Sequence, residues 1–319
     1  MNNFKKIGLT ALAGSLIATS AFAGSMSVTG GADISLMDSS NADQGNSFSS
    51  GDSLNFSGSG ELDNGMVVTS NVEIDAGTYD DRSVVIEMPE MGTLKFQQSG
   101  DTAMSAVDDV MPTAYDASWD VLGSTTTAPA TGQTLKSAAI GGYTTANNFF
   151  YTAPEMVEGL GVNVSYTPSG TGRPDGSISY ALAYTGVEGL TIGYAADDNG
   201  KKGTSKIENE TMYAKYAFGS FTVGVQSSEA DGVASADDDE FSAHGITYQV
   251  TDDFTIGYHA SEYQFGDQTG DQESKSIQAA YTMGGMTIKA QSVSMDNVGG
   301  STAARDDVDG YKFNVSFAF

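Results

Sequence analysis

Five aspartates in one long irregular segment, residues 99–146, are the first residues of the chain that could do chemistry. They are Asp101, Asp108, Asp109, Asp116 and Asp120, and among them lie Met111, Tyr115 and Trp119. Crowded carboxylates repel one another unless cations attend them, and Ca²⁺ prefers several hard oxygen ligands. The pair Asp108 and Asp109 is therefore a candidate Ca²⁺ site. The alternative is a solvated acidic loop.

Sequence motifs of catalysis are absent. The chain contains no G-x-S-x-G, H-E-x-x-H or P-loop pattern, the motifs typical of hydrolases, zinc proteases and nucleotide-binding proteins. The two histidines, His244 and His259, have no obvious nucleophile or ligand partner, and there is no cysteine for thiol chemistry or disulfides. We therefore expect neither an enzyme nor a bound cofactor, the Ca²⁺ candidate apart.

The composition narrows the class of protein. The 319 residues include 41 acidic and 14 basic ones, for a net charge of −27, which argues against nucleic acid or an anionic membrane surface as a partner. The 39 glycines and only six prolines fit an all-β chain with many tight turns.

The first 23 residues have the pattern of a secretory signal peptide. Lys5 and Lys6 precede a short apolar run, and Ala21, Phe22 and Ala23 form a small-x-small cleavage site. The apolar run is too short to span a bilayer as a helix. We expect an exported chain with a single domain over residues 24–319 and, without the two leader lysines, a net charge near −29.

Alternating polarity extends along almost the whole of residues 24–319. The last strand, residues 309–319, places a large apolar side chain at every second position, and such a strand has one apolar and one polar face. About sixteen segments share this pattern. They are residues 24–37, 53–62, 66–75, 82–88, 93–98, 147–153, 159–167, 177–185, 189–196, 210–218, 220–226, 241–250, 253–263, 274–283, 285–293 and 309–319.

The connectors between these segments alternate between short turns and long, polar, acidic stretches. The long ones are residues 39–52, 76–81, 99–146, 168–176, 197–209, 227–240, 264–273 and 294–308. This sorting is typical of a transmembrane β-barrel that faces lipid outside and water inside, and a soluble sandwich has no need of it. Aromatic residues near the strand ends fit the interfacial girdles of such a barrel.

The apolar face of each strand predicts which side chains point into the lumen. Four lysines are expected inside, together with His259, whereas Arg82 is ambiguous because its strand is short. The lysines are Lys95, Lys215, Lys289 and Lys312, and the inward acids are Asp33, Glu61, Glu73 and Glu87. The last strand should pair with the first, so that no strand edge is left unpaired in lipid. In that last strand, Phe313, Val315, Phe317 and Phe319 should face lipid.

The leader, the sixteen alternating strands, the long connector after the fifth strand and the terminal Phe319 together resemble the Gram-negative general porins, especially the alphaproteobacterial type. The resemblance implies a homotrimer of 16-stranded barrels in the outer membrane, among lipid and lipopolysaccharide. It implies that residues 99–146, the third long loop, fold into the lumen and narrow it. It also implies that the barrel-assembly machinery recognises Phe319.

The predicted function is a pore for passive diffusion of small hydrophilic solutes and ions. Charge rings set ion preference in pores, and the family often places arginines opposite the loop acids. Here the only arginines are Arg82, Arg173 and Arg305, so we expect a cation-leaning or weakly selective pore. The alternatives are a substrate-selective channel on the same barrel, a secreted β-rich surface or adhesion protein, and a barrel enzyme.

Overall fold

The computed structural model describes residues 24–40, 47–98, 102–104, 107, 110–119, 147–170, 175–198, 206–234, 238–303 and 306–319. The predicted signal peptide and most of residues 99–146 lie outside this part of the chain. None of the helices among the described residues is long and apolar enough to cross a membrane.

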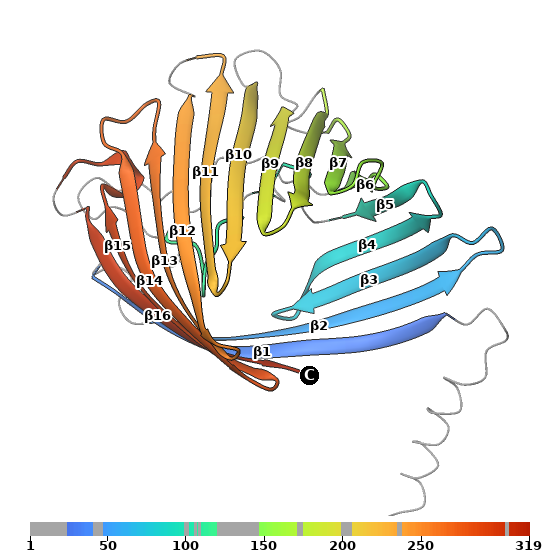
Figure 1. Ribbon diagram of the computed structural model, residues 1–319, viewed down its shortest axis with the longest axis horizontal. Helices are drawn as coiled ribbons and strands as arrows, with labels where there is room; N and C mark the ends of the chain where they lie inside the picture. The colour runs from blue at the N-terminus through green and yellow to red at the C-terminus, as the bar shows by residue number, and fades with distance from the viewer. Residues whose placement is uncertain are drawn as a thin grey trace, which may run out of the picture.

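Sixteen antiparallel strands form one closed barrel in which each strand pairs with its neighbours in sequence (Figure 1). The first eight are β1 (Ser25–Ser39), β2 (Ser47–Glu61), β3 (Val67–Asp75), β4 (Thr78–Met88), β5 (Gly92–Gln97), β6 (Asn148–Thr152), β7 (Leu160–Thr167) and β8 (Ser177–Val187). The others are β9 (Leu190–Asp198), β10 (Ile207–Phe218), β11 (Phe221–Gly232), β12 (Asp239–Thr251), β13 (Phe254–Gln264), β14 (Gln272–Met283), β15 (Met286–Asp296) and β16 (Val308–Ala318). A short 3₁₀-helix, η4 (Val298–Gly300), lies between β15 and β16. The sixteen-stranded barrel expected from the alternation is confirmed.

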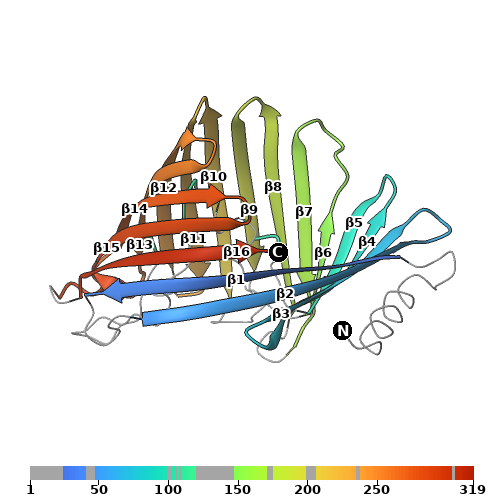
Figure 2. The same cartoon turned by 90° about the horizontal axis from the view of Figure 1, so that it is seen from below.

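The seam between β1 and β16 closes the barrel as expected (Figure 2). Leu36 pairs with Phe313 and Gly31 with Ala318, and the backbones of Gly30 and Phe319 exchange two hydrogen bonds of 2.8 and 3.0 Å. A Cβ at Gly30 would lie 2.7 Å from the ring of Phe319, so the ring would have to shift to admit a side chain there. No strand edge is left open at the junction.

The burial pattern is inverted relative to a water-soluble barrel. Large apolar side chains such as Ile277 (70% exposed) and Phe317 (43% exposed) cover the outside, whereas small polar ones are buried inside. Outward aromatics cluster at both strand ends. Tyr216, Phe218, Phe221 and Tyr248 stack beside a short turn, and Phe96, Phe149 and Tyr166 pack at tilted angles near the long connector. An apolar outer wall between two aromatic girdles is typical of a barrel that is surrounded by lipid.

The strand ends at the long connectors differ from the sequence prediction. Residues 76–81 were expected to form a long loop, but Ala76 and Gly77 form a tight turn with φ of 47° and 76°, and β4 already begins at Thr78. β11 continues to Gly232, beyond its expected end at residue 226. Beyond the lipid both faces of a strand meet water, so polarity no longer alternates there.

Candidate pore constriction

Residues 102–104 begin a segment of the long connector that lies against the inner wall of the barrel. The backbone N–H of Ala103 donates to Ser165 Oγ on β7 (3.0 Å), and that of Met104 donates to Ser179 Oγ on β8 (3.4 Å). Further on, Gln226 Nε2 of β11 donates to the carbonyl of Val107 (3.5 Å). The wall side chains that receive the loop are thus the small polar residues that alternate with outward apolar ones.

Three glycines of consecutive strands leave room for the next stretch of the loop. Gly224, Gly245 and Gly257 lie on β11, β12 and β13, and Gly224 is directly opposite Gly245. A Cβ on Gly224 would lie 2.6 Å from Pro112 Cδ, and one on Gly245 would lie 2.5 Å from the carbonyl oxygen of Pro112. A Cβ on Gly257 would lie 3.2 Å from Ala114 N. Isolated strand glycines often mark such close backbone approach.

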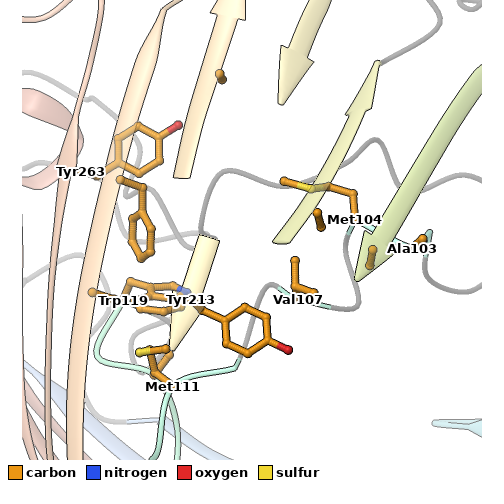
Figure 3. Packing of buried hydrophobic residues seen from close by; sticks show 13 residues of the cluster. Ala103, Met104, Val107, Met111, Trp119, Tyr213 and Tyr263 are labelled. Atoms are coloured by element: carbon orange, nitrogen blue, oxygen red, sulfur yellow. The ribbon is translucent and has the colours of Figure 1, made fainter. Parts of the chain in front are cut away.

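Trp119 anchors the other end of the described loop. Its indole is 2% exposed and packs edge-on against Phe241 and against His259, with ring centroids 4.9 Å apart in both contacts. The N–H of the preceding Ser118 donates to Nδ1 of His259 (3.1 Å). Figure 3 shows Trp119 beside Met111 and Tyr213, within the buried apolar cluster that joins loop and wall.

The tip of the loop reaches the far side of this wall. Gln278 of β14 accepts hydrogen bonds from the N–H groups of Ala114 (2.7 Å) and Tyr115 (2.9 Å) and donates to the carbonyl of Asp116 (2.6 Å). Gln291 of β15 donates to the same carbonyl (3.1 Å). The described loop residues contact inward groups of β7, β8 and β11–β15. This segment therefore lies inside the barrel.

A sequence profile described as Gram-negative porin matches residues 8–319. The chain belongs to the Gram-negative porin family. A sequence search of curated proteins finds no match.

Three solved structures illustrate the likeness of fold. The trimer form of OmpT, an outer membrane protein of Vibrio cholerae, is 11% identical, with 93% of this chain and 100% of that chain covered and a TM-score of 0.67. OmpF of Salmonella typhi is 13% identical, with 93% and 98% covered and a TM-score of 0.67. A mutant of the Rh. blastica porin is 14% identical, with 92% and 100% covered and a TM-score of 0.64. The alphaproteobacterial type stays a prediction.

The strand pairing of this porin places the four predicted lysines on the inward face. Lys289 and Lys312 approach the ring of Tyr115 at the loop tip. Lys95 of β5 lies 4.0 Å from Asp81, and Lys215 of β10 lies beside Gly224 on the loop-bearing wall.

Arg82, a possible pore-lining residue in the sequence prediction, faces outward in the structure. It pairs with Val72, on the same face as the outward Val84, and its guanidinium lies 4.9 Å from the ring of the exposed Tyr79. Arg82 is therefore not a pore-lining residue. A register shift between β3 and β4 lies next to it, where Val72 and Ile74 oppose Arg82 and Tyr79.

The predicted wall acids are also inward by their pairing. Asp33 of β1 accepts a hydrogen bond from Asn314 Nδ2 (2.8 Å) across the seam. Glu61, Glu73 and Glu87 lie on β2, β3 and β4, and within the described residues none of these three makes an ion pair. Among the residues that the structure describes, these three carboxylates of the wall have no cation within ion-pair distance.

Of the five loop aspartates, only Asp116 is within the described residues. Its carboxylate lies 3.9 Å from Lys312 Nζ. Asp101, Asp108, Asp109 and Asp120 lie outside the described part of the chain, and so does the candidate Ca²⁺ pair. Among the residues that the structure does describe, no group of three or more acidic or histidine side chains is arranged to hold a metal ion.

The wall residues that bind the loop were missed by the sequence prediction. Ser165, Gln226, Gln278 and Gln291 are ordinary inward polar residues of a barrel, and His259 looked like an isolated histidine. The available signal was the set of inward glycines on three consecutive strands, because strand glycines that are not at turns often receive another backbone.

Proposed function

We propose that this protein is an outer-membrane channel for passive diffusion of small hydrophilic solutes, with a preference for cations. The family and the closed barrel are those of an outer-membrane diffusion channel. An apolar exterior and a polar interior suit a water-filled pore through lipid. The preference for cations is the finer part of the proposal and depends on the lumen charges.

The unpaired carboxylates of β2–β4 are the observation that carries the preference. Glu61 and Glu87 are exposed to the lumen and Glu73 is half-buried. Two of the four inward lysines have an acidic neighbour, because Lys95 lies beside Asp81 and Lys312 beside Asp116. Acidic rings of this kind favour cations in pores, since unneutralised charge next to the permeation path acts over about 10 Å at 0.1 M salt.

The reversal potential of the purified protein in a planar bilayer tests the proposal. In a tenfold KCl gradient we expect a potential of the sign that indicates K⁺ permeating faster than Cl⁻. A potential of the opposite sign would overturn the cation preference, and well-folded protein that conducts no current would overturn the channel itself.

A homotrimer is part of the proposal. The resemblance to general porins implies it, and the similar OmpT of Vibrio cholerae has a trimer form. We expect one reconstituted particle to close in three equal current steps and to migrate as a trimer on a native gel. Single-step closure of every particle would contradict the assembly. The surrounding partners we propose are outer-membrane lipid and lipopolysaccharide.

We propose that the barrel-assembly machinery recognises Phe319 after a leader, which is then cleaved, has directed the export of the chain. Its ring is 74% exposed at the short-turn end of the seam, beside the turn between β14 and β15, whereas its backbone completes the pairing with Gly30. A Phe319→Ala variant should therefore refold in vitro like the parent but insert poorly in cells. Equal insertion in cells would exclude that role.

The alternatives lack a supporting observation among the described residues. A substrate-selective channel would need an arginine ladder or an aromatic track in the lumen. An adhesion protein would be soluble without detergent, and the exposed apolar wall argues against that. The family and fold are those of a channel, so we propose no catalytic role.

A further inference from the structure

Tyr115, at the tip of the loop, lies beside two lysines of the inner wall. Its ring centroid is 5.4 Å from Lys289 Nζ of β15 and 5.5 Å from Lys312 Nζ of β16. Both distances are within the range at which a cation is attracted to an aromatic face. Half of the inward lysines predicted for this lumen therefore share one aromatic side chain.

The position of Tyr115 is fixed by the wall rather than by the lysines. The amide of Gln278 accepts the N–H groups of Ala114 and Tyr115, and Gln278 and Gln291 both donate to the next carbonyl, that of Asp116. These two glutamine side chains are only 2% and 3% exposed. Short bonds to buried amides hold the backbone on both sides of the ring.

One of the two lysines, Lys312, also has an acidic neighbour. Asp116 Oδ2 lies 3.9 Å from Lys312 Nζ, and their side chains are 31% and 27% exposed. Asp33, on the adjacent β1, is a second negative charge that acts on Tyr115. Burial raises the pKa of Tyr115, and the charges of Asp116 and Asp33 raise it further, so the ring remains neutral.

We propose that Tyr115 is a specificity-determining residue that covers Lys289 and Lys312 and so withholds their charge from permeating anions. The inference rests on the proposed diffusion channel and explains how a lumen with four wall lysines favours cations. Without the ring, both ammonium groups would be free to turn toward the water of the pore. Glu61 and Glu87, which nothing covers in the described structure, would then meet competing positive charge.

The first test compares the K⁺ to Cl⁻ permeability ratio of Tyr115→Ala and Tyr115→Phe channels. For the alanine variant we expect the ratio to fall by about two- to fivefold, the size of one partly exposed cation–π contact. The phenylalanine variant keeps the ring and should match the parent. The fall should disappear when Lys289→Met and Lys312→Met are already present, because no covered cation remains to be released.

The second test measures access directly and does not depend on the selectivity of the parent. The chain has no cysteine, so Lys312→Cys introduces a single thiol. Its reaction with an anionic methanethiosulfonate should be severalfold faster when Tyr115→Ala is added. The same pair of measurements on Lys95→Cys, which is far from the loop tip on β5, should give equal rates.

The outcomes separate this inference from the proposed function. An anion-selective parent would overturn the cation preference, whereas faster thiol reaction without Tyr115 would still support the covering role. Unchanged selectivity together with unchanged thiol reaction would overturn the inference. The emission of Trp119, the only tryptophan, shows whether the loop stays in place. If the emission shifts in the alanine variant, the Tyr115→Leu variant is used instead, because leucine fills the space without an aromatic face. An unchanged permeability ratio in Tyr115→Leu would overturn the inference.

Discussion

Two parts of the lumen wall differ in what they present to the pore. The loop-binding wall, on β7–β15, offers hydroxyls, amides and glycines, and these are Ser165, Ser179, Gly224, Gln226, Gly245, Gly257, His259, Gln278 and Gln291. The acidic wall, on β2–β4, offers carboxylates, and these are Glu61, Glu73, Asp81 and Glu87. The first wall is chemically suited to binding a backbone, and the second to attracting ions.

The difference shows how one barrel separates structure from selectivity. Amide and hydroxyl groups satisfy a loop backbone at close range, and each such hydrogen bond contributes about 0.5–1.5 kcal/mol. Carboxylates would be poor loop-binding groups, because a buried carboxylate without a partner is costly. Where carboxylates face water, however, their charge is available to permeating ions. Neither wall could replace the other.

Removal of Trp119 should have the largest effect on the loop-binding wall. Truncating a buried tryptophan costs about 3–5 kcal/mol, and Trp119→Ala deletes the contacts with Phe241 and His259 together. We expect the loop to leave the wall, which protease cleavage within residues 99–146 and a noisy single-channel current would reveal. Trp119→Phe, which keeps an edge-on ring, is the matched control. A quiet, protease-resistant alanine variant would mean that the loop is held elsewhere.

A methyl group added to one of the three glycines under the loop should have the next largest effect. Gly245→Ala places a Cβ 2.5 Å from the carbonyl oxygen of Pro112, and overpacking of this kind costs about 1–3 kcal/mol. We expect the emission of Trp119 to move to longer wavelength as the loop shifts. Gly161→Ala is the control, because its Cβ would meet nothing closer than a carbonyl 3.8 Å away on β8. Equal spectra for the two variants would contradict a loop packed on Gly245.

The barrel was predictable from the sequence because lipid imposes a strict rule. Outward positions within the bilayer are predominantly apolar, as at Met212, Tyr216 and Phe218 of β10, so the alternation is visible in a single sequence. Above the lipid the rule ends, which is why the extension of β11 to Gly232 and the tight turn at Ala76 were missed.

The candidate site was predictable only in part. Charge identified the acidic segment, and the alternation of each strand gave the face on which each wall lysine lies. The loop-binding residues carry no charge, and a buried Gln278 reads in sequence like any other lumen-facing polar residue. Only the pairing of strands shows that Gly224, Gly245 and Gly257 form one surface.

The acidic wall should respond in selectivity rather than in stability. In a Glu61→Gln, Glu73→Gln, Glu87→Gln variant we expect the K⁺ to Cl⁻ permeability ratio to fall by a factor of two to five, which corresponds to about 0.4–1 kcal/mol of charge interaction across water. The fall should shrink at 1 M salt, where the Debye length is about 3 Å. Glu188→Gln, in the short turn before β9, is the control. If the variant instead lost thermal stability and kept its selectivity, these glutamates would stabilise the fold rather than set the ion preference.

The smallest effect is expected for the charge pair at the border between the two walls. Asp116 and Lys312 are 3.9 Å apart and about a third exposed, and such pairs contribute about 0–1 kcal/mol. Asp116→Asn leaves the carbonyl that Gln278 and Gln291 bind, so the emission of Trp119 should stay at the parent wavelength at low and high salt. Gln278→Met, which keeps the volume but loses the hydrogen bonds, should shift it. If the asparagine variant instead released the loop as readily as Gly245→Ala, charge rather than backbone hydrogen bonding would hold the loop tip on its wall.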